Sequence, residues 1–394
     1  MPGSVIVSSA RTPIGKLSGS LATLPATDLG GHAIRAALAR AGISGDQVDY
    51  VLMGQVLQAG AGQMPARQSA VKGGVPMSVP SMTVNKVCLS GIDAIYLADQ
   101  MIQAGDAEIV IAGGMESMTR APYLLPNARE GYRMDHGQLV DSMIGDGLWC
   151  AFDAMHMGAA TERYNGERGG ITRAMQDEFA ARSHERAAAA MKDGKLAEEI
   201  EPVEIPQRRG DPVLVDTDEG VRPGTTPESL GALRAAFAPD GTITAGNASQ
   251  ISDGAAAVVV MSAEKADRLG IIPLAELVSY GMVAGPDPSL LTQPSRAIVR
   301  ALDKIGKQVG DLDLIEINEA FAAVAIASMH DLGVSDDIVN VNGGAIAFGH
   351  PVGASGTRVV LTLVNELRRR GGGLGAASLC GGGGQGEAAV VRVP

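Results

Sequence analysis

Short runs of apolar residues alternate along this chain with longer stretches in which apolar residues recur every three or four positions. The short runs predict buried strands at residues 5–7, 48–56, 83–84, 109–114, 255–261, 314–317 and 376–384. The longer stretches predict helices at residues 28–41, 92–104 and 173–192. Gly42 and Gly105 follow the first two, where a helix commonly ends. Strands that alternate with helices indicate the α/β class.

The residue pattern of the first half of the chain returns in the second half. Two matching sets lie at one constant offset: Ala33, Leu38, Gly42, Val48, Asp49 and Val51, and then Ala297, Leu302, Gly306, Leu312, Asp313 and Ile315. Ser90-Gly91 and Ser355-Gly356 then open a helix in each copy. We therefore predict two similar βαβ-rich halves. The first comprises residues 1–120, completed by about 248–270, and the second comprises residues 271–394.

The segment between the two copies, residues 121–247, has a different character. It combines loops rich in proline, glycine and charged residues with one amphipathic helix. We predict that it is an insertion that projects from the first half. Insertions of this kind commonly form substrate-binding surfaces.

Composition restricts the class of protein further. With 394 residues, of which 45% are hydrophobic and 19% charged, the chain predicts a globular protein with a sizeable core. The net charge of −12 argues against nucleic acid or an anionic membrane as a partner, and no apolar run reaches the ~18 residues of a membrane span. The three scattered cysteines, Cys88, Cys150 and Cys380, fit neither a disulfide framework nor a spaced zinc site. We expect a reducing, cytoplasmic location and no metal.

One cysteine stands where a helix is predicted to begin, in the stretch Asn85-Lys86-Val87-Cys88-Leu89-Ser90-Gly91. Unpaired backbone N–H groups and the positive end of a helix dipole both favour thiolate over thiol. We therefore expect a lowered pKa and a nucleophilic Cys88. The alternative is that Cys88 is a small buried apolar residue, which is common for a free cysteine.

Three more chemically active residues lie at predicted strand ends or helix starts. His350 is fixed in the glycine-rich stretch 340–356, Cys380 is followed by four glycines, and Asn318 ends a buried strand. Each has a structural alternative, since an isolated loop histidine is often structural and Asn318 could cap a helix. Taken together, they suggest acyl transfer through a thiol, with backbone N–H groups that hold an oxyanion. A second cysteine suits a reaction that also moves a carbon-bound proton.

Four stretches together resemble the thiolase family, and the match covers essentially the whole chain. They are Asn85-Lys86-Val87-Cys88-Leu89-Ser90-Gly91, Asn318-Glu319-Ala320-Phe321, Gly343 to Gly356, and Cys380-Gly381-Gly382-Gly383-Gly384. The resemblance implies a thiolase-like fold. Two duplicated α/β halves would pack in alternating helix and sheet layers, active-site loops would meet between them, and an inserted loop domain would bind coenzyme A.

The resemblance also implies roles for individual residues. Cys88 would carry the acyl group, and His350 would activate Cys88 and later stabilise an oxyanion. Cys380 would be the acid and base at the α-carbon. Asn318 would hold a water that shares the first oxyanion hole with His350, and the N–H groups of Cys88 and Gly382 would form the second.

The coenzyme A site is expected mainly in the inserted segment. The residues that match it are Leu148, His156, Met157, Gly158, Arg222, Phe237, Ala245 and Ser249, joined by Phe321 of the second half. Arg222 suits a phosphate or ribose contact and Phe237 could cover the adenine, although each could be structural when taken alone.

The acyl pocket both matches and departs from the family pattern. The triplet His156-Met157-Gly158 resembles the short-chain, acetoacetyl-cleaving branch of the family. Trp149-Cys150 and Asp153-Ala154-Met155 differ from the expected pattern and leave the acyl length open. Cys150 is expected to serve packing only.

The leading hypothesis is an acyltransferase of the acetyl-CoA C-acetyltransferase type. It would condense two acetyl-CoA molecules to acetoacetyl-CoA and CoA, or run the reverse thiolysis, without a cofactor. The alternative is a medium- or long-chain 3-ketoacyl-CoA thiolase of fatty-acid β-oxidation. A ketosynthase-like enzyme would need a second catalytic histidine in place of Asn318 or Cys380, and a redox protein would need a C-x-x-C motif; this chain offers neither. Thiolases that this chain resembles associate through the first half, and many pair dimers through a loop like residues 122–141. This resemblance, together with the apolar side chains of that segment, implies a homotetramer built from dimers.

Overall fold

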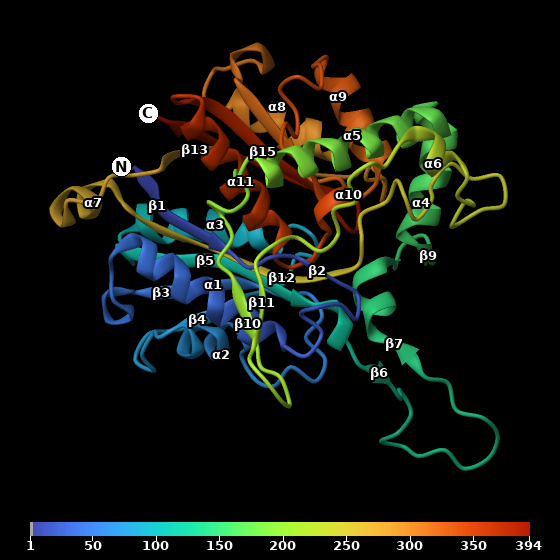
Figure 1. Ribbon diagram of the computed structural model, residues 1–394, viewed down its shortest axis with the longest axis horizontal. Helices are drawn as coiled ribbons and strands as arrows, with labels where there is room; N and C mark the ends of the chain where they lie inside the picture. Colours follow the sequence, from blue (N-terminus) through green and yellow to red (C-terminus); the bar gives the residue numbers. More distant parts are fainter. Residues whose placement is uncertain (1–2) are drawn as a thin grey trace.

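One mixed sheet runs through both halves of the chain in the computed structural model, which describes residues 3–394 (Figure 1). Its strands are β1 (Ser4–Arg11), β2 (Gly15–Lys16), β3 (Tyr50–Gly54), β4 (Ser81–Val84), β5 (Ile109–Ser117), β12 (Ser252–Ser262), β13 (Ala275–Ala284), β14 (Leu314–Ile317), β15 (Gly373–Gly381) and β16 (Gln385–Val393). The strand order is β14-β15-β16-β13-β1-β12-β5-β3-β4, with β2 paired to β12 beside this path. β1 and β13 share only two residue pairs, Val5 with Glu276 and Ile6 with Ala275. The sheet therefore divides there into two smaller sheets.

These two sheets have the same topology. In the first half, β3 is parallel to both β4 and β5, and β12 joins β5 to β1 through antiparallel pairs. In the second half, β14 is parallel to β15, and β16 joins β15 to β13 through antiparallel pairs. Val339 makes a parallel bridge to Ile315 at the position that β4 occupies in the first half. The predicted duplication is confirmed by this repeated strand order.

Matching residues of the two halves also make matching contacts. An Asp49 carboxylate oxygen accepts the N–H of Ile109 at 2.9 Å, at the start of β5. An Asp313 carboxylate oxygen accepts the N–H of Leu374 at 2.8 Å, in the first residues of β15. Each aspartate therefore fixes the register of the parallel strand beside it, which explains why both copies carry it.

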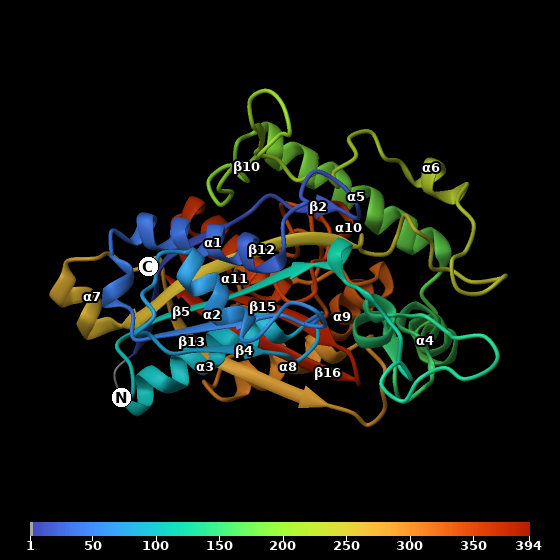
Figure 2. The same ribbon diagram turned by 90° about the horizontal axis from the view of Figure 1, so that it is seen from below.

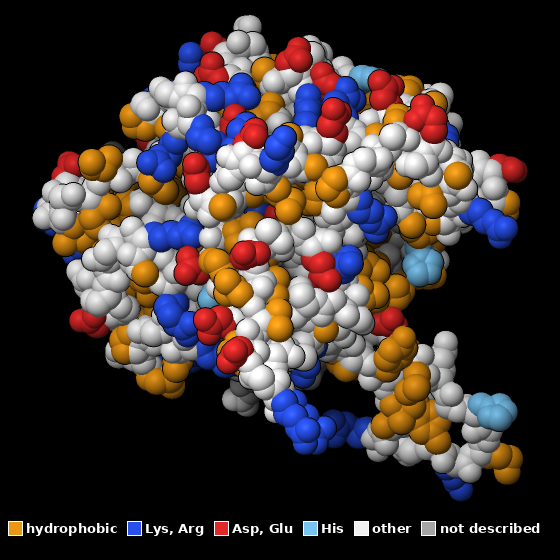
Figure 3. All heavy atoms as spheres, viewed as in Figure 1, with side chains coloured by type: hydrophobic (Ala, Val, Ile, Leu, Met, Phe, Trp, Pro, Cys, Tyr) orange, Lys and Arg blue, Asp and Glu red, His pale blue; other side chains and the backbone are white. Residues whose placement is uncertain are grey.

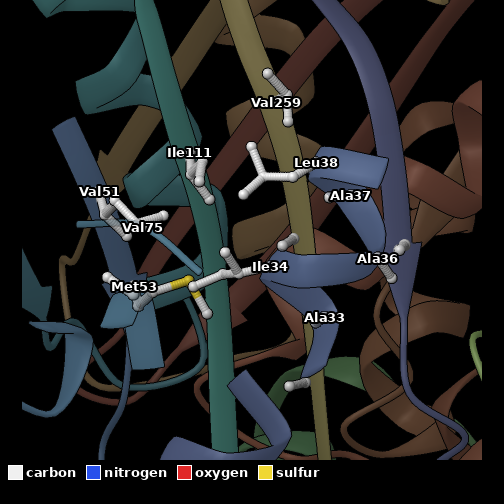
Figure 4. Close-up of a cluster of buried hydrophobic side chains, with 14 of the residues drawn as sticks. Ala33, Ile34, Ala36, Ala37, Leu38, Val51, Met53, Val75, Ile111 and Val259 are labelled. Carbon is white, nitrogen blue, oxygen red and sulfur yellow. The ribbon is translucent and has the colours of Figure 1, made fainter. Parts of the chain in front are cut away.

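Helices cover both faces of the two sheets. They are α1 (Ala26–Ala41), α2 (Pro65–Lys72), α3 (Ser90–Ala104), α7 (Ala263–Leu269), α8 (Gln293–Asp303), α9 (Ala322–Leu332), α10 (Ala345–Phe348) and α11 (Ser355–Arg369). α3 and α11 pack together between the sheets, whereas α1 and α8 lie on the outer faces. Side chains of β12 alternate between the layers, since Val258 and Val260 join the inner core and Val259 and Met261 the outer one. Figure 4 shows the outer core, where α1 lies over β12, β5 and β3.

Residues 121–247 lie at one side and along one face of this core (Figure 2). Their elements are β6 (Tyr123–Leu124), β7 (Val140–Asp141), β8 (Trp149–Cys150), β9 (Met155–His156), α4 (Met157–Tyr164), α5 (Arg173–Lys192), β10 (Val203–Ile205), β11 (Val213–Val215) and α6 (Pro227–Gly231). The fully buried Arg11 joins them to β1, because its guanidinium binds Glu199 and Asp218 at 2.7 Å each. α5 packs on α9 and α10 of the second half.

Some predicted bounds were wrong by a few residues. β1 extends beyond the predicted residues 5–7 as far as Arg11, because burial between two carboxylates lets this cation stay in the sheet. The strand predicted at 376–384 ends at Gly381, since Gly383 and Gly384 turn the chain with φ of +81° and +67°. The strand predicted at 48–56 is the shorter β3.

Candidate active site

The turn from β4 into α3 presents Cys88 on a strained backbone. Val87 has φ of +52°, a rare conformation for a β-branched residue. The Ser90 hydroxyl braces this turn, since it accepts the N–H of Lys86 at 2.9 Å and donates to the Val87 carbonyl at 2.6 Å. Strain held in this way directly before a cysteine is typical of a site at which a side chain must be aimed.

The expectation of a lowered Cys88 pKa was wrong for the substrate-free protein. Burial raises the pKa of the Cys88 thiol to about 12, and the nearby Glu116 raises it further, while the N–H groups of Cys88 and Gly382 act in the opposite direction. α3 begins only at Ser90, so its dipole does not overcome desolvation. Cys88 is therefore a thiol at rest and needs a base to become a nucleophile.

His350 is a neutral imidazole whose tautomer follows from its neighbours. The Ser355 hydroxyl donates to the Pro351 carbonyl at 3.0 Å, so its oxygen accepts the 2.6 Å hydrogen bond from Nδ1–H of His350. Nε2 of His350 is then an acceptor, and the Asn318 side-chain amide nitrogen lies 3.4 Å from it. Burial and the positive charge of Arg358 lower the pKa of His350 to about 3. His350 is therefore neutral at neutral pH, and its Nε2 carries no proton.

Asn318 and Cys380 lie at the ends of neighbouring parallel strands, β14 and β15. Both are fully buried, and Oδ1 of Asn318 has no hydrogen-bond partner among the described residues. Burial raises the pKa of the Cys380 thiol, and the proximity of Cys88 raises it further. The structure thus brings the two cysteines together, although they lie in opposite halves of the chain.

A cavity of about 540 Å³ is lined mainly by the inserted segment, and the four residues described above are not part of its lining. Its lining includes all nine residues that the resemblance assigns to coenzyme A: Leu148, His156, Met157, Gly158, Arg222, Phe237, Ala245, Ser249 and Phe321. Leu148 also packs in the cluster that contains Cys88, and Met157 and Phe321 pack in the cluster that contains Cys380. Residues of the cavity lining therefore adjoin both thiols.

An aromatic row shapes one wall of this cavity. Phe237 packs on Gly158 so closely that a Cβ there would lie 2.1 Å from the ring, which explains the glycine after Met157. The rings of His156 and Trp149 meet edge to face at 5.1 Å. Trp149, the single tryptophan, is not part of the cavity lining, so this departure from the family pattern can affect the pocket through the contact with His156.

Several supporting residues were not found from the sequence. Ser355 fixes the His350 tautomer, and Lys16 adds a cation to the cavity lining. Nδ1 of His184 accepts the N–H of Arg222 at 3.2 Å and so holds the loop of that residue. A histidine on the amphipathic helix 173–192 was the only signal for the last contact, and a serine five residues after His350 was the signal for the first.

Comparison with known proteins assigns the family. The model described as "Thiolase, N-terminal domain" matches residues 4–264, and the model described as "Thiolase, C-terminal domain" matches residues 271–393. These matches cover the duplicated sheets, both cysteine turns and the inserted segment. The chain belongs to the thiolase family, and it is an acyltransferase of that family.

Relatives carry a more specific description. A "Probable acetyl-CoA acetyltransferase" of Mycolicibacterium smegmatis is 58% identical over 388 residues, which are 98% of this chain and 100% of the relative. A protein of Mycobacterium tuberculosis with the same description is 57% identical over 392 residues, 100% of each chain. The "Acetyl-CoA acetyltransferase" of Cupriavidus necator is 56% identical over 389 residues, 98% of each chain.

None of the helices in residues 3–394 is both long and apolar enough to cross a membrane. Nor do His, Cys, Asp and Glu side chains in the described part of the chain form a group of three or more that could hold a metal ion.

Proposed function

We propose that this protein is an acetyl-CoA acetyltransferase, which condenses two acetyl-CoA molecules to acetoacetyl-CoA and CoA and also runs the reverse thiolysis. The supporting observation is a cavity lined by all nine residues that the resemblance assigns to coenzyme A, three of which also pack with the thiols: Leu148 with Cys88, and Met157 and Phe321 with Cys380. Full-length relatives with that description give independent support. In this proposal the CoA thioesters are substrates and no cofactor takes part.

The first half-reaction transfers an acetyl group to Cys88. Nε2 of His350 takes the thiol proton as the sulfur attacks the thioester carbonyl, because a thiol with a pKa near 12 is a weak nucleophile and a neutral imidazole is available. The N–H groups of Cys88 and Gly382 stabilise the oxyanion. The departing CoA thiolate takes the proton of Cys380, which leaves Cys380 as a thiolate.

The second half-reaction forms the carbon–carbon bond. The Cys380 thiolate takes a proton from the α-carbon of the second acetyl-CoA. His350, now protonated, and a water bound at Oδ1 of Asn318 hold the enolate oxygen, and that oxygen of Asn318 is free to accept a hydrogen bond. The enolate carbon attacks the acetyl group on Cys88, and the released Cys88 sulfur recovers its proton from His350. The protons balance, and acetoacetyl-CoA leaves.

Chain length gives the test of this function. His156 and Met157 line the cavity, Met157 also packs in the cluster that contains Cys380, and the bulky Trp149 ring packs against His156. Acetoacetyl-CoA should therefore be cleaved with a kcat/KM at least about tenfold above that of a C8 or C12 3-ketoacyl-CoA. The assay follows loss of the enolate absorbance after addition of CoA. Equal kcat/KM values across these lengths would favour the medium- or long-chain thiolase instead.

We further propose a homotetramer. The β6–β7 loop extends away from the body of the protein, and Figure 3 shows hydrophobic side chains on it. Tyr123, Leu125, Met134 and Leu139 are 65%, 43%, 93% and 63% exposed, which is costly for a monomer. Light scattering of the wild type should give the mass of four chains. Shortening residues 126–138 should give the mass of two, because the loop would join dimers. A monomeric wild type at micromolar concentration contradicts any association.

We also propose a cytoplasmic location and the domain division given by the repeat. The first half would comprise residues 1–120 and be completed by 248–270, residues 121–247 would be the inserted domain, and residues 271–394 would form the second half. The pairing of β12 with β1 and β5 supports this return of the chain to the first sheet. Three cysteines that form no disulfide are compatible with a reducing compartment.

A further inference from the structure

A buried carboxylate links the two halves of the chain beside Cys88. Glu116 follows the apolar run of β5 and is fully buried. Its oxygens accept the N–H groups of Val56 at 3.0 Å, Leu57 at 3.1 Å and Gly353 at 3.0 Å. Val56 and Leu57 follow β3 of the first half, whereas Gly353 belongs to the loop before α11 of the second. No cation pairs with Glu116 among residues 3–394. The three N–H groups favour its charged form, but burial outweighs them and raises the pKa of Glu116 to about 7.

The carbonyl group of Gly353 also packs closely against the first half. A Cβ on Gly54, Gly91 or Gly114 would lie 2.7, 3.0 or 1.9 Å from the Gly353 carbonyl oxygen. These glycines come from β3, α3 and β5, so the first half offers bare backbone from three elements at this one contact. The loop is therefore held at its N–H by Glu116 and enclosed at its carbonyl.

The elements that Glu116 joins are those that carry the reacting groups. Gly353 lies three residues after His350, and Val352 packs in one cluster with Val56, Leu57 and Cys88. Val56 and Leu57 thus belong to the apolar cluster on which Cys88 packs. The Gly353 loop carries His350, which comes from the opposite half. A single carboxylate fixes both parts relative to each other.

The chemistry of the Glu116 carboxylate indicates that it aligns the backbone N–H groups around it and does not merely fill space. A carboxylate offers two acceptor oxygens to three N–H groups, whereas an amide of the same shape would turn its NH₂ group towards one of them. The negative charge also has a cost at this place, because it raises the pKa of Cys88. A group that disfavours the thiolate is not there to activate sulfur by its charge.

We propose that Glu116 is a positioning residue that sets the alignment of Cys88 with His350 by clamping the backbone after β3 to the loop before α11. This inference rests on the proposed acyl transfer. It adds to that transfer a residue outside the cavity lining, which acts through the backbone and touches no substrate.

The test replaces Glu116 by Gln and compares this variant with Thr357→Val. The hydroxyl of Thr357, on α11, donates to the Gly91 carbonyl at 3.1 Å. Like the Glu116 contacts, this is a buried hydrogen bond between the two halves, but it does not involve the Gly353 N–H. In E116Q, kcat for acetoacetyl-CoA thiolysis should fall about 10²-fold, the effect of a small misplacement of reacting groups. KM should stay within about threefold, since the cavity residues are untouched. T357V should retain kcat within about threefold.

Alkylation of Cys88 by iodoacetamide, measured by mass on the Cys88 peptide, supplies a readout without acyl substrate. E116Q should react more slowly than the wild type, because His350 is displaced, although loss of the Glu116 charge alone would speed the reaction. A failure of the proposed function appears separately, as a wild type that alkylates readily at Cys88 but cleaves no acetoacetyl-CoA.

Each other outcome overturns the inference. Faster alkylation in E116Q would show that only the charge of Glu116 matters, and a normal kcat would show that the clamp is dispensable. An equal loss in T357V would show a general effect of contact between the halves. Failure of both E116Q and Glu116→Asp to fold, judged by circular dichroism, would make Glu116 a folding residue instead.

Discussion

Cys380→Ala should still be acetylated on Cys88 by acetyl-CoA but should lose carbon–carbon bond formation by several orders of magnitude. Acyl transfer needs a thiol at Cys88, the base Nε2 of His350 and an oxyanion hole, and none of these involves Cys380. The CoA thiolate can take its proton from His350 instead. Mass spectrometry should therefore show one acetyl group on the Cys88 peptide.

Condensation fails in this variant because no other base stands at the α-carbon. The thiol at the end of β15 is buried among Leu290, Ala320 and Val324, which offer no substitute proton acceptor. Loss of condensation and of α-proton exchange with solvent should exceed the ~10²–10⁴-fold typical of general acid–base catalysis alone. Nearly normal α-proton exchange in Cys380→Ala would contradict the role given to this cysteine.

Cys88→Ala and Cys150→Ala complete the comparison. Cys88→Ala should lose both acetylation and turnover, since it removes the only group that carries the acyl chain. Cys150 is buried against Ala160, Tyr164 and Phe179 and lies outside the cavity lining, so Cys150→Ala should keep both half-reactions within about threefold. Loss of acetylation in Cys150→Ala would show that the cysteines do not divide the work as proposed.

The fold could be predicted from the sequence where residues of the same type have the same structural role in both copies of the repeat. Asp49 and Asp313 stand at one offset because each holds the first residues of a parallel strand, and Gly42 and Gly306 both take positive φ after a helix. The join between the two halves could not be predicted. Between the sheets it consists of two residue pairs of β1 and β13, and neither strand carries a local pattern that identifies its partner.

The residues of the site could be predicted from their motifs, whereas their ionisation could not. Cysteine before a helix suggested a thiolate, but the pKa of Cys88 is governed by burial among side chains that come from both halves. Glu116 illustrates the same limit. A glutamate after an apolar run is visible in the sequence, yet its partner Gly353 lies far along the chain. Such contacts follow from tertiary packing, which local patterns do not encode.

His350→Asn should lower kcat for thiolysis about 10³- to 10⁴-fold, because it removes a general base and weakens an oxyanion donor together. Neutral imidazole is the form that can accept the Cys88 proton, and with a pKa near 3 this form persists throughout the neutral range. Asparagine can still donate a hydrogen bond at that place but cannot accept a proton from sulfur. Alkylation of Cys88 by iodoacetamide should therefore slow in parallel with turnover.

Ser355→Ala tests how the orientation of the His350 imidazole affects kcat, and His32→Asn is the control. Ser355→Ala leaves the imidazole in place but removes the hydroxyl that accepts the 2.6 Å hydrogen bond from its Nδ1–H. The tautomer with the proton on Nε2, which cannot accept a proton from Cys88 there, then becomes populated, and kcat should fall about 10- to 100-fold. His32 lies on α1, outside the site, and His32→Asn should keep kcat within about threefold. If His350→Asn kept kcat within tenfold of the wild type, another group would have to take the proton from Cys88, and the proposed first half-reaction would be wrong.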